Sequence, residues 1–100
     1  MRHKSSISND DAVIRQVRES PQFAVEYLKA AMEDAREPQV LLIALRHIVE
    51  ARGGFARVAK AAGIERESLH RALSARGNPR FSTLLAVVHA IGLKLTLEAA

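Results

Sequence analysis

The sequence predicts an all-α domain of five helices followed by one short C-terminal strand. Three observations favour this class. First, 48% of the 100 residues are hydrophobic, which is normal for a chain that folds around one core. Second, this apolar content is mostly Ala, Leu, Val and Ile, and Ala and Leu are strong helix formers. Third, the apolar residues recur at spacings of three and four along five stretches, as in amphipathic helices.

The N-terminal region is predicted to hold a tail and one helix. Residues 1–11 are almost wholly polar, and we expect a flexible tail there. Residues 12–37 form the N-terminal segment and the first helix. The pair Ser20-Pro21 is typical of a helix start, and this helix should end near Ala35. Ahead of it, three apolar residues could form a short strand or a helical turn that docks on the body: Val13, Ile14 and Val17.

Residues 38–92 are predicted to form the main helical domain. Glycine, or a Gly-Asn-Pro turn, follows each apolar stretch in this range and marks the end of a helix. The four expected helices run from Pro38 to about Arg52, over Phe55–Ala62, over Arg66–Ser74, and from Phe81 to about Ile91.

The last segment, residues 93–100, is predicted to contain the strand. Leu93, Leu95 and Leu97 alternate with polar residues, which is the period of a strand. A lone strand cannot satisfy its own backbone hydrogen bonds, so it needs a partner. That partner is either another copy of the chain or another protein. The three leucines are therefore candidate dimerisation residues.

Several classes of chemistry are not supported by the residues present. There are no cysteines, which excludes a disulfide framework, a thiol nucleophile and a thiolate metal site. None of the four histidines lies three or four residues from another, so no metal-binding pair forms on a helix face. No Ser-His-Asp arrangement or phosphate loop is suggested. We therefore expect no catalysis, no metal and no cofactor. The apolar runs are short and no secretory signal is visible, so we expect a cytoplasmic protein without a membrane partner.

The positive charge is concentrated in one part of the chain. The net charge is +4, but residues 39–80 carry eight bases against three acids, a local excess of +5. This basic stretch contains two short helices whose spacing is typical of a helix-turn-helix, over residues 55–74. Ala59 lies where the two helices would cross most closely, and Gly63 supplies the left-handed turn. The apolar Ile64 and Leu69 would fill the angle between the helices, and Val58 and Ala62 would complete the buried set.

In this interpretation the helix from Arg66 reads double-stranded DNA. Arg66 and Arg71 can each donate two hydrogen bonds to guanine or pair with phosphate. Two alternatives remain open: both arginines could be solvated surface charges, and Glu67 could simply pair with Arg71. The candidate DNA-binding residues are Arg57, Lys60, Arg66, Glu67, Ser68, His70, Arg71, Ser74 and Arg76.

The runs that carry this pattern also resemble a known family. They are Ala44–Gly53, Val58–Ile64, Arg66–Ser74, Gly77-Asn78-Pro79 with Phe81, and Ile91–Leu95, led by Tyr27–Asp34. Together they resemble the addiction-module antidote family, HigA-like antitoxins with a lambda-repressor-like helix-turn-helix domain of the XRE type. The resemblance implies a toxin partner of the RelE/ParE-like fold and operator binding that represses the shared operon. It also implies a homodimer, in which the terminal strand could pair across the two copies.

The chain departs from this family at the start of both short helices. Glu65 stands where such antitoxins commonly have a serine that caps the reading helix and touches phosphate. Phe55 and Ala56 stand where a polar phosphate contact is common. Two alternatives therefore accompany the antitoxin hypothesis: a stand-alone repressor, and a protein-interaction module whose helix-turn-helix no longer binds DNA. Toxin contact would use the Ser20–Ala35 helix and the polar N-terminal segment.

Overall fold

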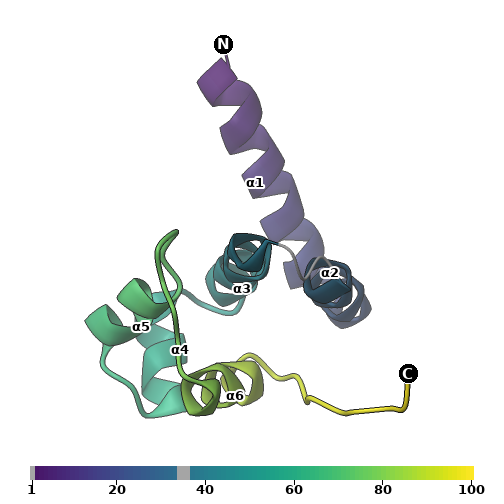
Figure 1. Cartoon of the computed structure of the whole chain (residues 1–100). Coiled ribbons are helices and arrows are strands. Elements are labelled where there is room, and N and C mark those ends of the chain that lie inside the picture. Colours follow the sequence, from purple (N-terminus) through teal and green to yellow (C-terminus); the bar gives the residue numbers. More distant parts are fainter. Residues whose placement is uncertain (1, 34–36) are drawn as a thin grey trace.

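The computed structural model describes residues 2–33 and 37–100, and within them every regular element is a helix (Figure 1). The all-α prediction is confirmed, but six helices are present where five were predicted. In chain order they are α1 (Arg2–Glu19), α2 (Pro21–Glu33), α3 (Pro38–Ala51), α4 (Phe55–Ala62), α5 (Arg66–Ala72) and α6 (Phe81–Ala90).

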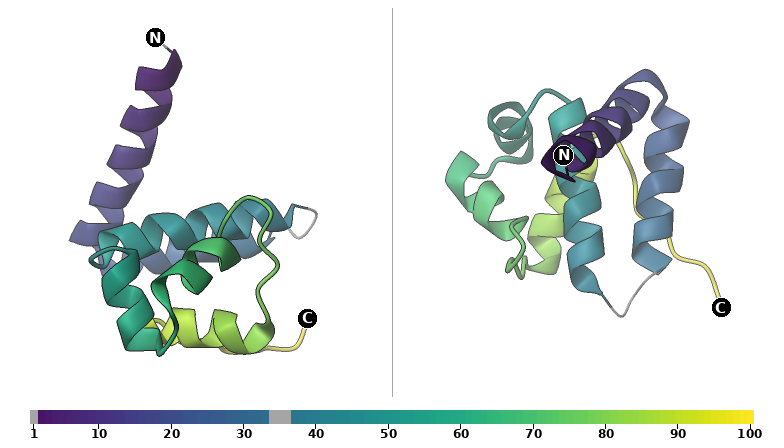
Figure 2. Two further views of the ribbon diagram at one scale, coloured as in Figure 1. Left: turned by 90° about the vertical axis from the view of Figure 1, so that its left-hand side faces the viewer. Right: turned by 90° about the horizontal axis from the view of Figure 1, so that it is seen from above.

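The additional helix is α1, which occupies the region expected to hold a tail. Its C-terminal half docks on the body: Val17 is completely buried, and Val13 and Ile14 pack against the core. Once these residues fix a few helical turns, each further residue adds one hydrogen bond without a new nucleation cost. The helix therefore continues outward through the polar residues, and its N-terminal half projects away from the rest of the molecule (Figures 1 and 2).

The start of α2 follows its sequence signals closely. The Ser20 hydroxyl accepts a hydrogen bond from the Phe23 amide at 3.1 Å, as expected of an N-cap residue. The predicted end near Ala35 lies outside the described residues. After it, α3 begins at Pro38, and α2 and α3 lie side by side (Figure 2).

The core is built around α3. Ala44, Leu45, Ile48 and Val49 are at most 1% exposed. Helices α1 and α2 pack on α3, and α4 packs on α3, α5 and α6. One continuous hydrophobic core joins both groups, with Leu69 and Leu73 on the α5 side and Val87 and Ile91 on the α6 side. The candidate functional helices are thus held by the same core as the N-terminal helices.

The predicted C-terminal strand is wrong for the single chain. The Leu93 amide still bonds to the Val88 carbonyl at 3.0 Å, and the Leu93 side chain packs on the core. Beyond it, residues 94–100 form no regular element. Alternating leucines alone do not make a strand, because a strand needs a neighbouring backbone and the described helices offer none. Pairing across a dimer is not seen in this single chain and stays a proposal.

Among the described helices, none is both long enough and apolar enough to cross a membrane.

Candidate nucleic-acid interface

The two short helices α4 and α5 are joined by a tight turn at Gly63. The Gly63 backbone is left-handed, with φ 72° and ψ 31°, as its predicted role requires. Its amide bonds to the Lys60 carbonyl at 3.2 Å, and the next amide, that of Ile64, bonds to the Ala59 carbonyl at 2.9 Å. These bonds satisfy carbonyls at the end of α4 and set the direction in which α5 leaves.

The inner side of this helix pair is buried as the spacing predicts. Val58 and Ala59 are 2% exposed, and Leu69 is completely buried. Ile64 is half-buried and packs against the core between the helices. Ala62, which was also expected to be buried, is only half-buried. The core therefore fixes which side of α5 faces solvent.

The outer side of α5 presents a small group of charged side chains. Arg66, Glu67, His70 and Arg71 are all exposed and line one open hollow on the surface. Within the described residues, no ion pair joins Glu67 to Arg71, so the i,i+4 pair considered from the sequence is not formed. Both arginines of this face are therefore available to a ligand.

The remaining candidates lie around this face with different degrees of exposure. Arg57, Lys60 and Arg76 are exposed, whereas Ser68 and Ser74 are half-buried. The Ser74 hydroxyl donates a hydrogen bond to the Arg71 carbonyl at 2.8 Å, so it is engaged at the end of α5. The structure places these residues near one helix pair, and their contacts with DNA stay predictions.

The start of α5 has the weakness that the sequence indicated. Glu65 occupies the N-cap position with an extended backbone, and its side chain makes no capping hydrogen bond. Glu67 follows in the first turn. Two carboxylates at this helix end repel phosphate, although each also stabilises the positive end of the helix dipole.

Phe55 has a structural role that the sequence did not indicate. It is 8% exposed, and its ring packs against the His70 ring with 4.8 Å between ring centroids and an interplanar angle of 42°. This contact positions His70, one of the candidate DNA-binding residues on the outer side of α5. Phe55 therefore belongs to the core and supports the outer face of α5 from below.

Sequence reasoning missed two arginines that hold helix ends. The Arg46 guanidinium in α3 donates to the carbonyl of Leu73, the C-cap residue of α5. The Arg52 Nε donates to the carbonyl of Ile91 at 3.2 Å, at the end of α6. Both satisfy carbonyls that a helix end leaves free. These two of the eight bases in residues 39–80 are directed at helix carbonyls, which leaves six as candidates for phosphate contact.

A second feature that the sequence did not reveal is a row of three polar side chains that links α1, α2 and α3. The Tyr27 hydroxyl in α2 lies 2.6 Å from Nδ1 of His47 in α3, and Nε2 of His47 lies 3.2 Å from an Asp10 carboxylate oxygen in α1. Burial, and to a smaller degree the Asp10 charge, raise the pKa of the Tyr27 phenol. Among the residues described, no group of side chains could hold a metal ion. These contacts tie α1 to α2 and α3.

One curated relative, an uncharacterized protein of Haemophilus influenzae (strain ATCC 51907 / DSM 11121 / KW20 / Rd), is 40% identical over 60 residues, which are 60% of this chain. The match covers 61% of that relative's length. No solved structure matches the chain. A family model described as "Probable addiction module antidote protein" matches residues 11–99. Because this match spans most of the chain, the protein belongs to that family of addiction-module antidotes.

Proposed function

We propose that this protein is the antitoxin of a type II toxin-antitoxin module. It acts in the cytoplasm, binds and neutralises a RelE/ParE-like toxin, and binds operator DNA as a homodimer to repress its own operon. Family membership indicates the antitoxin role and implies a toxin partner in general. Three finer points belong to the proposal. They are the fold of the toxin, the operator DNA as target, and a HigA-like helix-turn-helix of the XRE type.

One observation supports the DNA-binding half of the proposal. The outer side of α5 is exposed, carries Arg66 and Arg71, and is held at a defined angle by the Gly63 turn. A helix with this composition fits the major groove, where arginine recognises guanine through two hydrogen bonds. Arg57, Lys60 and Arg76 on the flanking surface would position the protein through phosphates.

The acidic residues give this interface a selective character. Glu67 can accept a hydrogen bond from cytosine, but beside a phosphate it costs affinity. A reading helix with both signs of charge therefore binds weakly to arbitrary DNA and gains most at a sequence that satisfies each side chain. This favours one specific operator over general attraction to DNA.

The DNA-binding half is tested by a gel shift with the DNA upstream of the gene. Arg66→Ala and Arg71→Ala should each weaken binding by at least about 5- to 150-fold, which is the loss expected at each half-site when one bidentate base contact worth about 1–3 kcal/mol is removed. Arg18→Ala is the matched control, because Arg18 is exposed on α1 and lies outside the candidate face. Binding unchanged in both α5 variants would refute the reading-helix assignment. Absence of binding at low salt would favour the interaction module.

The toxin-binding half is tested by co-expression with the neighbouring reading frame. If that frame encodes a basic toxin, its expression alone should stop growth and this chain should restore it. Restoration should survive Arg66→Ala and Arg71→Ala, since toxin contact is proposed for α1 and α2. Without a toxic neighbour, the alternative of a stand-alone repressor would replace the antitoxin proposal.

A further inference from the structure

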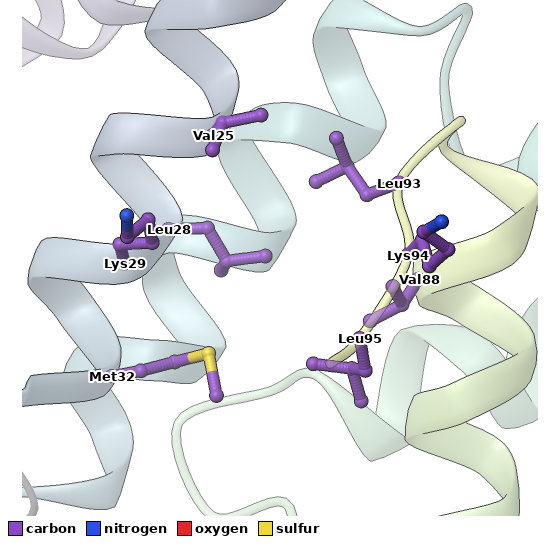
Figure 3. A pocket seen from close by; sticks show the side chains of 8 residues that line it. All are labelled: Val25, Leu28, Lys29, Met32, Val88, Leu93, Lys94 and Leu95. Carbon is purple, nitrogen blue, oxygen red and sulfur yellow. The ribbon is translucent and has the colours of Figure 1, made fainter. Parts of the chain in front are cut away.

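An apolar groove lies between α2 and the segment that follows α6 (Figure 3). Val25, Leu28 and Met32 form one side, and Val88, Leu93 and Leu95 form the other. Met32 is 47% exposed, although it points into this groove. Lys29 and Lys94 also line it, and within residues 2–33 and 37–100 no acidic side chain does. The groove is therefore an unfilled apolar surface in the single chain.

The segment beside this groove forms no regular element in the single chain. In residues 94–98, Leu95 is half-buried, whereas Lys94, Thr96 and Glu98 are exposed. Leu97 continues the leucine alternation but is 101% exposed, so it contacts nothing that shields it. In the part of the chain that the structure describes, no backbone hydrogen bond engages residues 94–98. Their amides and carbonyls are free to pair with a second strand.

The order of residues in this segment is complementary to itself. In an antiparallel pair centred on Thr96, Lys94 of one copy lies opposite Glu98 of the other, at both ends of the pair. Leu95 lies opposite Leu97, and the two copies of Thr96 face each other. Opposite charges, apolar pairs and threonine pairs are all favourable when they face each other across antiparallel strands. The leucines of both copies share one face, and the polar residues share the other.

Neighbouring registers lose this complementarity. A pair centred on Lys94 places the two lysines directly opposite each other, which is destabilising. A pair centred on Leu95 places Lys94 opposite Thr96 and leaves Glu98 opposite Gly92. The charges therefore select the register centred on Thr96 among those that keep the leucines near the groove.

We propose that Lys94–Glu98 pairs with the same segment of a second copy of this chain, in antiparallel register centred on Thr96. The four leucines of the ribbon cover the two grooves, so that the exposed Leu97 is buried by the partner. A two-stranded ribbon alone is only marginally stable, and the groove supplies the apolar surface that it needs. The contact is the same on both copies and closes as a two-fold dimer. It deepens the homodimer of the proposed function, and its test involves neither DNA nor toxin, so the two can fail separately.

The test exchanges the two charges and measures the dimer dissociation constant of the full chain by sedimentation at low ionic strength. Lys94→Glu places Glu opposite Glu at both ends of the ribbon, and Glu98→Lys places Lys opposite Lys. Each single variant should dimerise at least about tenfold more weakly than the wild type. The equimolar mixture of the two variants should form heterodimers, because each mixed pair restores both opposite charges. The double variant should regain the wild-type affinity.

Controls separate the ribbon from other effects. Arg15→Glu changes the net charge equally on an exposed face of α1 and should leave the dimer unchanged. Leu97→Ser should weaken the dimer without affecting the helical content of the monomer, because Leu97 is fully exposed in the single chain. A wild type that stays monomeric at the highest attainable concentration would overturn the proposal. Single variants that dimerise like the wild type, or a mixture that does not associate, would overturn the register.

Discussion

Replacing Arg46 by methionine separates the structural cations from those proposed to bind DNA. The Arg46 guanidinium is half-buried and donates a hydrogen bond to the Leu73 carbonyl at the end of α5. Such charge-assisted bonds contribute about 1.5–3 kcal/mol, and a cation at a helix C-terminus adds about 0.3–1 kcal/mol where it is exposed. Because this group is partly solvated, we expect the variant to lose about 1–2 kcal/mol of unfolding free energy. Methionine keeps most of the aliphatic stem and limits the packing loss.

Urea unfolding followed by helical circular dichroism measures this loss. The midpoint should fall without a change in slope, and Tm should fall by about 4–16 °C for a domain of this size. Lys60→Met is the matched control, because Lys60 is exposed and should change stability by no more than about 0.5 kcal/mol. Arg46→Lys keeps the charge but loses the bond geometry, and should fall between the two. Equal stability of the Arg46→Met and Lys60→Met variants would refute the structural role of this arginine.

Three further predictions follow from individual contacts. Tyr27 is the one tyrosine of the chain, so phenolate absorbance reports its titration directly. The pKa measured in this way should lie above 10.0. A pKa at or below that value would contradict the burial of the phenol near Asp10. Because this pKa is raised on folding, its contribution to the unfolding free energy is present below about pH 10 and is lost as the pH rises through the folded-state pKa. In urea unfolding, the Tyr27→Phe variant should lose less unfolding free energy than the wild type over this pH range. Gly77→Ala should destabilise the protein by at least about 1 kcal/mol, since a Cβ would lie 2.0 Å from the Ala72 carbonyl oxygen. Unchanged thermal stability of this variant would exclude such a close approach. Leu69→Ala should cost about 2–5 kcal/mol in the same measurement, because Leu69 of α5 is fully buried in the core. A loss below about 1 kcal/mol would contradict that packing.

The helices that the sequence predicted well are those with local signals at both ends. Pro38 begins α3, and a left-handed Gly63 separates α4 from α5, as their positions in the sequence indicated. Such signals act over a few residues and need no knowledge of the fold. The apolar stripes between them then identify the buried face, which is why Val58, Ala59 and Leu69 were predicted correctly.

The features that the sequence did not reveal all depend on contacts between distant residues. Arg46 and Leu73 are 27 positions apart, and Tyr27 and His47 are 20 positions apart. Nothing local distinguishes Arg46 from the exposed Arg57, because their different roles arise only when the fold brings the Arg46 side chain within hydrogen-bond reach of the Leu73 carbonyl. The length of α1 was missed for the same reason: its polar N-terminal half has no apolar stripe and extends from a C-terminal half that only tertiary packing stabilises.

The division of the basic charge limits what one copy of the chain can do on DNA. Arg46 and Arg52 are directed at helix carbonyls. The six other bases of residues 39–80 are exposed, and so are the three acids of this range. Arg46 and Arg52 keep their charge but are not free to make direct phosphate contacts, and Glu65 and Glu67 place opposing charge at the start of α5. In the proposed dimer, two copies joined by the terminal ribbon would bind two half-sites at a high effective concentration, which raises affinity without any new contact. Lys94→Glu should therefore weaken operator binding in the gel shift although residue 94 lies outside the α5 face, and adding Glu98→Lys to the same chain should restore it. Operator binding that ignores both substitutions would mean that the ribbon does not join the DNA-binding units.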